Sequence, residues 1–111
     1  MSSNLNLHAR LAIESRTLDV RSSIVAYWRG LSPVSQVFAS TKRLRAQSRA
    51  TRKIAPREAD VVLGAAAAVE VLVDGAESAL AAGDVDLAED RLREALTAIT
   101  APRIILGTKE I

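Results

Sequence analysis

The sequence predicts an all-α protein, a small bundle of about four helices that ends in an antiparallel αα-hairpin over about residues 57–100. The composition favours helices, because 49% of the residues are hydrophobic, only 3% are aromatic, and Gly and Pro number five and three. Apolar residues also recur every three or four positions in successive stretches, which is the helical period. At 111 residues the chain is expected to form one domain around a single core.

The first stretch predicts one long helix over about residues 4–29, because an apolar or small residue recurs every three or four positions. The row that carries this pattern consists of Ile13, Thr17, Val20, Ile24, Tyr27 and Leu31. Residues 5–13 also alternate between apolar and polar side chains, so a short extended arm before the helix is the alternative. Gly30 follows as a residue suited to a left-handed C-cap.

Ser32 and Pro33 open the second stretch as the types expected at an N-cap and at the first helical position. A second helix is therefore predicted from here to Pro56, since the residue before a proline avoids the helical region. Its apolar stripe is clear for about three turns and is then replaced by hydroxyl and alanine positions. The stripe consists of Val34, Val37, Phe38, Thr41, Leu44, Ser48, Thr51 and Ala55.

The third helix is predicted from Pro56 to about Ala82, and residues 61–73 make it apolar on nearly every side. It is therefore expected to be the central helix of the bundle. Its few polar positions predict a narrow strip that faces solvent. The strip consists of Glu70, Asp74 and Glu77.

Gly83 is expected to end the third helix and Asp84 to cap a fourth, which the apolar pattern extends to about Thr100. After Pro102, the tail contains three consecutive apolar residues, which predicts a short extended segment over residues 103–111. These three apolar residues are Ile104, Ile105 and Leu106.

The turn at Gly83 and the helix after it resemble the second half of a tetratricopeptide hairpin. The residues that carry the resemblance are Gly83, Asp84, Val85, Asp86, Ala88, Leu92, Ala95, Leu96 and Pro102. The resemblance covers about residues 72–102, and Gly75 and Ala79 stand where such repeats usually have larger apolar residues. No second copy follows, although stacked repeats need about three units. The resemblance thus implies an antiparallel helical hairpin and not membership of the family.

Charge divides the chain into two halves. Residues 1–57 contain eleven Lys or Arg and two acids, whereas residues 58–111 contain four Lys or Arg and eleven acids, so formal charges of +9 and −7 lie within a total of +2. The single domain is therefore expected to comprise a basic half (1–57), an acidic helical hairpin (58–100) and a tail (101–111).

Basic residues are densest in residues 42–57, where seven of sixteen are Lys or Arg and none is acidic. Spacings of three and four place most of them near one helical face, and such a face is typical of nucleic-acid binding. No base-reading motif accompanies it, so binding is expected to be independent of sequence. A solvated face, or pairing with the acidic half of a neighbouring copy, is the alternative. The candidate phosphate-binding residues are Lys42, Arg43, Arg45, Arg49, Arg52, Lys53 and Arg57.

The sequence contains no catalytic, cofactor or metal signature. It has no Cys, which excludes disulfides and thiolate chemistry, and its single histidine, His8, is expected at the surface. A Gly-rich phosphate loop and a Ser/His/Asp set are also absent from it. The protein is therefore expected not to be an enzyme and to need no cofactor or metal.

Several features favour a cytoplasmic location, or one within a particle assembled in the cytoplasm. The lack of Cys fits a reducing compartment, and the first residues lack the apolar core of a signal peptide. The longest apolar run, residues 61–73, is shorter than the roughly twenty residues needed to span a bilayer. No membrane span is therefore expected.

The leading hypothesis is a non-catalytic structural protein that associates with nucleic acid and self-assembles as a subunit of a coat or nucleoprotein complex. The alternative is an interaction subunit or adaptor whose basic and acidic faces bind other proteins or copies of itself. Either hypothesis predicts an interface, and the apolar tail and the aromatic residues near the end of the first helix are the candidates. These interface residues are Tyr27, Trp28, Ile104, Ile105 and Leu106.

Overall fold

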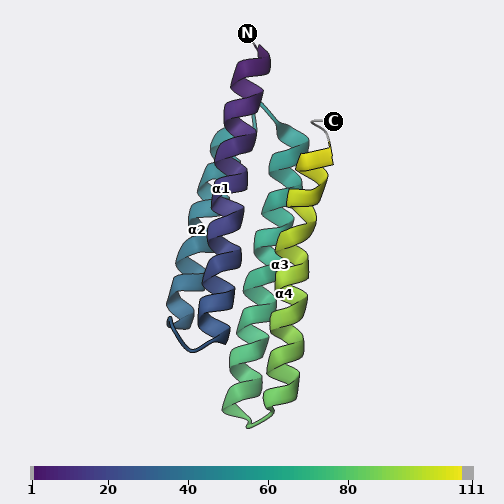
Figure 1. Cartoon of the computed structure of the whole chain (residues 1–111). Coiled ribbons are helices and arrows are strands. Elements are labelled where there is room, and N and C mark those ends of the chain that lie inside the picture. Colours follow the sequence, from purple (N-terminus) through teal and green to yellow (C-terminus); the bar gives the residue numbers. More distant parts are fainter. Residues whose placement is uncertain (1, 109–111) are drawn as a thin grey trace.

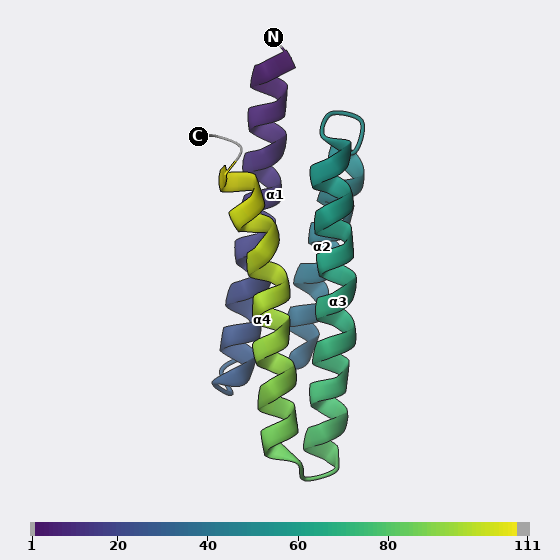
Figure 2. The same ribbon diagram turned by 90° about the vertical axis from the view of Figure 1, so that its right-hand side faces the viewer.

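The described residues form four helices that pack as an up-and-down bundle (Figure 1). The computed structural model describes the backbone of residues 2–108 and the side chains of residues 7–100. The helices are α1 (Ser2–Trp28), α2 (Val34–Thr51), α3 (Pro56–Ala81) and α4 (Val85–Thr108). Each lies beside the next and α4 returns beside α1, whereas α1 and α3 are diagonal (Figure 2). The predicted all-α bundle and its C-terminal hairpin are therefore confirmed.

The bundle is a rod of 53 × 24 × 20 Å in which the two hairpins are offset along the long axis. The turn between α3 and α4 extends past the turn between α1 and α2 at one end, and the first turns of α1 extend past the other helices at the opposite end (Figure 1). This offset leaves the end of α1 beside the flank of the α3/α4 hairpin.

Gly30 and Gly83 make the two tight turns, as their sequence positions predict. Both adopt positive φ, 72° and 79°, which is strained for residues with a Cβ. After each glycine the next amide closes a six-residue ring, from Leu31 to the carbonyl of Ala26 and from Asp84 to that of Ala79, both at 2.8 Å. These are Schellman caps, which satisfy the last carbonyls of α1 and α3.

The N-terminal ends of the last three helices follow the sequence pattern with one shift. The amide of Leu87 donates to the Asp84 carboxylate at 3.0 Å, so Asp84 caps α4 as predicted. Pro56 lies in the first turn of α3, as expected. Pro33, however, occupies the N-cap of α2 with ψ 158°, and the expected Ser32 cap is wrong by one residue. The reason is that proline fixes φ but leaves ψ free to be extended or helical.

Both segments that were considered for extended structure are helical. α1 begins at Ser2, so the alternative of an extended arm over residues 5–13 is wrong. α4 continues through Pro102 to Thr108, so the predicted extended tail is wrong for residues 103–108, and residues 109–111 lie outside the described part of the chain. Pro102 costs the helix one hydrogen bond, but its fixed φ is compatible with helix.

The core is aliphatic and α3 contributes the most to it. Nine residues of α3 are buried, against six of the shorter α2. In α2 four of the buried residues carry hydroxyls, and each donates to a carbonyl of its own helix at 2.7–3.1 Å. Much of the buried side of α2 therefore consists of small hydroxyl side chains, which keep their hydrogen bonds while the helices pack closely. These residues are Ser40, Thr41, Ser48 and Thr51.

Candidate nucleic-acid interface

The helical period of α2 divides the basic run into two rows. Arg45 and Arg52, seven residues apart, are directed toward α3, where each meets an acidic side chain. Lys42 and Arg49, also seven apart, are exposed about 60° further around the helix, and Lys53 is exposed in the turn that follows α2. We call the first pair the inner row and the other three residues the outer row. The two rows have different chemical surroundings.

The strongest contact of the inner row is between Arg45 and Glu70. The Arg45 Nη2 donates to Glu70 Oε2 at 2.7 Å, and the Thr41 hydroxyl lies 2.8 Å from the same oxygen and shares its single proton between this oxygen and the Phe38 carbonyl. The Glu70 side chain is 20% exposed and that of Arg45 is 36% exposed. A charge-assisted bond of this length in a partly desolvated site is among the stronger hydrogen bonds in proteins. Glu70 therefore links α2 to α3. The prediction that Glu70 lies in a strip facing solvent is wrong.

Two more ion pairs join the basic half to the acidic half. The Arg52 Nε lies 3.4 Å from Asp60 Oδ1, with both side chains more than half exposed. Arg10 of α1 lies 3.8 Å from the Glu58 carboxylate, which is only 9% exposed. The charge division in the sequence is thus partly neutralised within one chain, by two contacts from α2 and its following turn to α3 and by one contact between the diagonal helices α1 and α3.

The outer row is not neutralised in this way. Lys42, Arg49 and Lys53 are exposed, and within the described part of the chain none of them forms an ion pair. Arg43 of α2 and Arg57 of α3 are also exposed and form no ion pair with the described residues. The helical rise places Lys42 and Arg49 about 10 Å apart along the axis, and Lys53 follows in the turn after α2. These exposed cations therefore form a short basic ridge, and α2 contributes no acidic residue to it.

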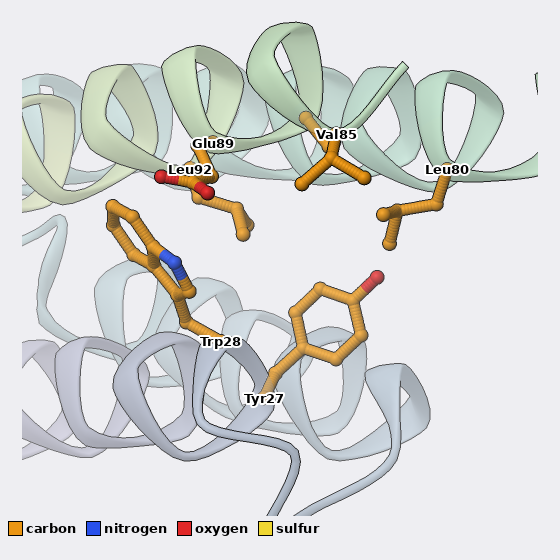
Figure 3. A pocket seen from close by; sticks show the side chains of 7 residues that line it. Tyr27, Trp28, Leu80, Val85, Glu89 and Leu92 are labelled. Carbon is orange, nitrogen blue, oxygen red and sulfur yellow. The ribbon is translucent and has the colours of Figure 1, made fainter. Parts of the chain in front are cut away.

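A second surface lies where α1 ends beside the α3/α4 hairpin. Tyr27 and Trp28 face Leu80, Val85 and Leu92 across a shallow groove of about 260 Å³ (Figure 3). The predicted interface residues Tyr27 and Trp28 are half-buried, so they line this groove and also contact the core.

A charged side chain acts on each of the two aromatic residues of the groove. The Arg93 guanidinium lies 5.6 Å from the centroid of the Trp28 ring, a cation–π distance. Burial of the Tyr27 hydroxyl, together with the negative charge of Glu77, raises the pKa of Tyr27 to about 12. Tyr27 is therefore neutral at physiological pH. The other predicted interface residues, Ile104, Ile105 and Leu106, lie outside the residues whose side chains are described.

The described residues offer no geometry for a metal site. No three His, Cys, Asp or Glu side chains among them lie close enough together to hold an ion, and His8 is exposed. Among the helices as described, none combines the length and the hydropathy required to cross a bilayer.

No family model, curated protein or solved structure matches the chain. The resemblance to a tetratricopeptide repeat is accordingly confined to the helical hairpin of α3 and α4.

Sequence reasoning missed the three ion pairs between the halves. The lone position of Glu70 within the apolar residues 61–73 was the available signal, because an isolated acid on a buried helix usually has a partner. The pairing of Arg10 with Glu58 had no comparable signal, since the two residues are 48 positions apart and lie in unremarkable polar surroundings.

Proposed function

We propose that this protein is a non-catalytic structural protein that binds nucleic acid through the outer row of α2, independently of sequence. The supporting observation is that Lys42, Arg49 and Lys53 stay exposed and unpaired in the described structure, although the same chain carries acids that neutralise the inner row. A ridge of unneutralised cations attracts a polyanion and gains free energy by releasing its counterions. In this proposal the protein acts in the cytoplasm as a subunit of a coat or nucleoprotein assembly.

The proposed binding has a physical signature. Contacts to phosphates make log affinity fall linearly with log salt, by about 0.9 for each phosphate neutralised on duplex DNA. Because contacts to phosphates carry no direct sequence information, the affinity is expected to vary little between sequences. Binding should also be measurable on single- and double-stranded DNA and RNA, whose relative affinities then define the natural class of ligand.

The two rows supply a matched experiment. Lys42→Gln/Arg49→Gln removes two cations of the outer row, and Arg45→Gln/Arg52→Gln removes two cations of the inner row at the same seven-residue spacing. The outer variant should weaken binding to every sequence tested and flatten the salt slope by about two units, from about 0.9 for each lost contact. The inner variant should keep most of the slope and lose folding stability instead.

Equal effects of the two variants on the salt slope would show that the outer row is not the binding surface. A wild-type protein that fails to bind any of the four nucleic acids at low salt would reject the proposal altogether.

The groove at the end of α1 favours a second candidate function, that of a protein-interaction subunit. Val85 is 55% exposed and Leu80 is 43% exposed beside half-buried Tyr27 and Trp28, which is the composition of a contact surface. This candidate predicts that association with the partner weakens on Val85→Glu and depends little on salt. Nucleic-acid binding through α2 would be unaffected by the same substitution.

A further inference from the structure

No other described helix covers the outward side of α3 (Figure 2). α2 and α4 pack on either side of α3, while Val61, Gly64, Ala67 and Val71 are exposed along its remaining face. Val61 is 42% exposed and Val71 is 72% exposed, although both are β-branched apolar residues. We call these four residues the α3 face.

Two features of the α3 face have no explanation within a single chain. Val71 exposes most of its side chain to water, at a cost that a polar residue would avoid. Gly64 lies inside a helix, where glycine costs about 1 kcal/mol relative to alanine. A Cβ at Gly64 would meet nothing within 4 Å, so no neighbour in the chain requires a glycine there.

We propose that two copies of the chain associate through this face, α3 against α3 and antiparallel. The two-fold axis passes between Ala67 and Ala68, so that Val71 of each copy packs over the partner subunit's Gly64. Only this register forms both Val71–Gly64 contacts, because Gly64 and Val71 are then equally distant from the axis on opposite sides. A large exposed side chain then fills the space left by the missing Cβ, and alanines at the axis allow the helices to approach closely.

The charges at the two ends of the α3 face favour the antiparallel orientation. Arg57 is exposed at the N-terminal end, with Lys53 just before it, and Asp74 is exposed at the C-terminal end. Asp60, the other acid on this side, already pairs with Arg52 at 3.4 Å. In this register the partner's Asp74 lies opposite Val61, about 6 Å along the axis from Arg57 and next to Asp60, whose charge Arg52 neutralises. The antiparallel pair thus brings each Asp74 to the net positive end of the other copy, whereas a parallel pair places like charges together. Such a self-complementary contact closes on itself and yields a dimer.

This dimer does not depend on the proposed binding of nucleic acid. A single helix pair is smaller than the about 800 Å² per partner of standard interfaces, so the association is expected to be reversible and visible in a concentration series. Sedimentation equilibrium of the full chain measures it directly. Val71→Glu should raise the dissociation constant at least tenfold and leave the helicity unchanged, because the side chain is exposed in the single chain.

Leu31→Glu is the matched control, because it places the same charge at another apolar residue that is as exposed as Val71, outside both the α3 face and the groove. It should leave association unchanged. The single substitutions Arg57→Asp and Asp74→Arg should each weaken the dimer, and the two together should restore it, since both pairs are then reversed. Gly64→Ala should raise the thermal stability of the dilute protein while it weakens association, a combination that a purely structural role for the glycine would not give.

Engineered cysteines test the orientation, because the chain has no Cys of its own. Under mild oxidation Ala67→Cys should form a disulfide-linked dimer, since the two copies of residue 67 lie beside the axis. Ser78→Cys should not, because its two copies would be about 30 Å apart along antiparallel helices. A cross-link through Ser78→Cys instead would show a parallel pair. That outcome, a chain that remains monomeric throughout the series, or dissociation by Val85→Glu but not by Val71→Glu, would overturn the proposal.

Discussion

The inner and outer rows of α2 have the same chemistry in sequence and opposite roles in the fold. Arg45 and Arg49 lie one turn apart, yet Arg45 donates to Glu70 at 2.7 Å while Arg49 is exposed and forms no ion pair with the described residues. The difference comes from α3, which packs against one side of α2 only. A dense basic run is therefore not one site, because the neighbouring helix decides which cations remain available for a ligand.

The largest expected effect on stability comes from removing Glu70, the acid that pairs with Arg45 of the inner row. Glu70→Ala should lower the free energy of unfolding by about 2 kcal/mol, because it leaves a partly buried arginine and a buried hydroxyl without their shared acceptor. Urea denaturation followed by circular dichroism measures the loss. Glu94→Ala is the control, since Glu94 pairs with Arg91 at 3.0 Å but both are well exposed. Equal losses for the two variants would mean that the partial burial of the Arg45–Glu70 pair does not add to the free energy of unfolding.

A smaller effect is expected from Thr41→Val, which keeps the shape of a fully buried side chain and removes its hydroxyl. Glu70 would retain Arg45 but lose one hydrogen bond, so the free energy of unfolding should fall by about 1 kcal/mol. Thr97→Val provides the comparison, because the hydroxyl of Thr97 is exposed and bonds only its own helix. A loss at Thr41 no greater than that at Thr97 would show that the bond to Glu70 is unimportant.

The ion pair between Arg52 of the inner row and Asp60 should contribute less to stability than the pair between Arg45 and Glu70. Asp60→Asn breaks the pair with Arg52, and both side chains are more than half exposed. Exposed ion pairs contribute about 0–1 kcal/mol, so the change in unfolding free energy should stay below about 0.5 kcal/mol and vanish at high salt. A change as large as that of Glu70→Ala would contradict the ranking of the inner row by burial.

The smallest effect, and the one with the opposite sign, belongs to the outer row. Lys42→Gln/Arg49→Gln/Lys53→Gln should leave stability unchanged or raise it by a few tenths of a kcal/mol, because like charges one turn apart repel. The stability of the wild type should rise with added salt more than that of the variant, as screening removes the same repulsion. Clear destabilisation of the variant would place the outer row among the residues that hold the bundle together.

The sequence predicted most of the fold because local chemistry determines it. Gly30, Gly83 and Asp84 act through hydrogen bonds within a few residues, so their roles could be read directly from the chain. Pro33 and Pro102 gave two errors in helix bounds, since proline fixes φ but permits both extended and helical ψ. A third error is the end of α2, which lies at Thr51 and not at the predicted bound before Pro56, because a turn intervenes.

The candidate site was less predictable, because its key contacts are long-range. Spacing placed Arg45 and Arg49 on one broad basic face, and only the position of α3 separates them. Thr41 and Glu70 are 29 residues apart, and nothing local to either indicates the other.

The short turns at Gly30 and Gly83 also bear on how fast the chain can reach its native state. Each hairpin joins helices that are adjacent in sequence, so most native pairings close short loops and lose little chain entropy. Helical bundles with such local contacts fold in about microseconds to milliseconds. Rapid refolding keeps the aliphatic core of α3 hidden from other chains, so a protein that meets its own copies at high concentration would gain protection from aggregation.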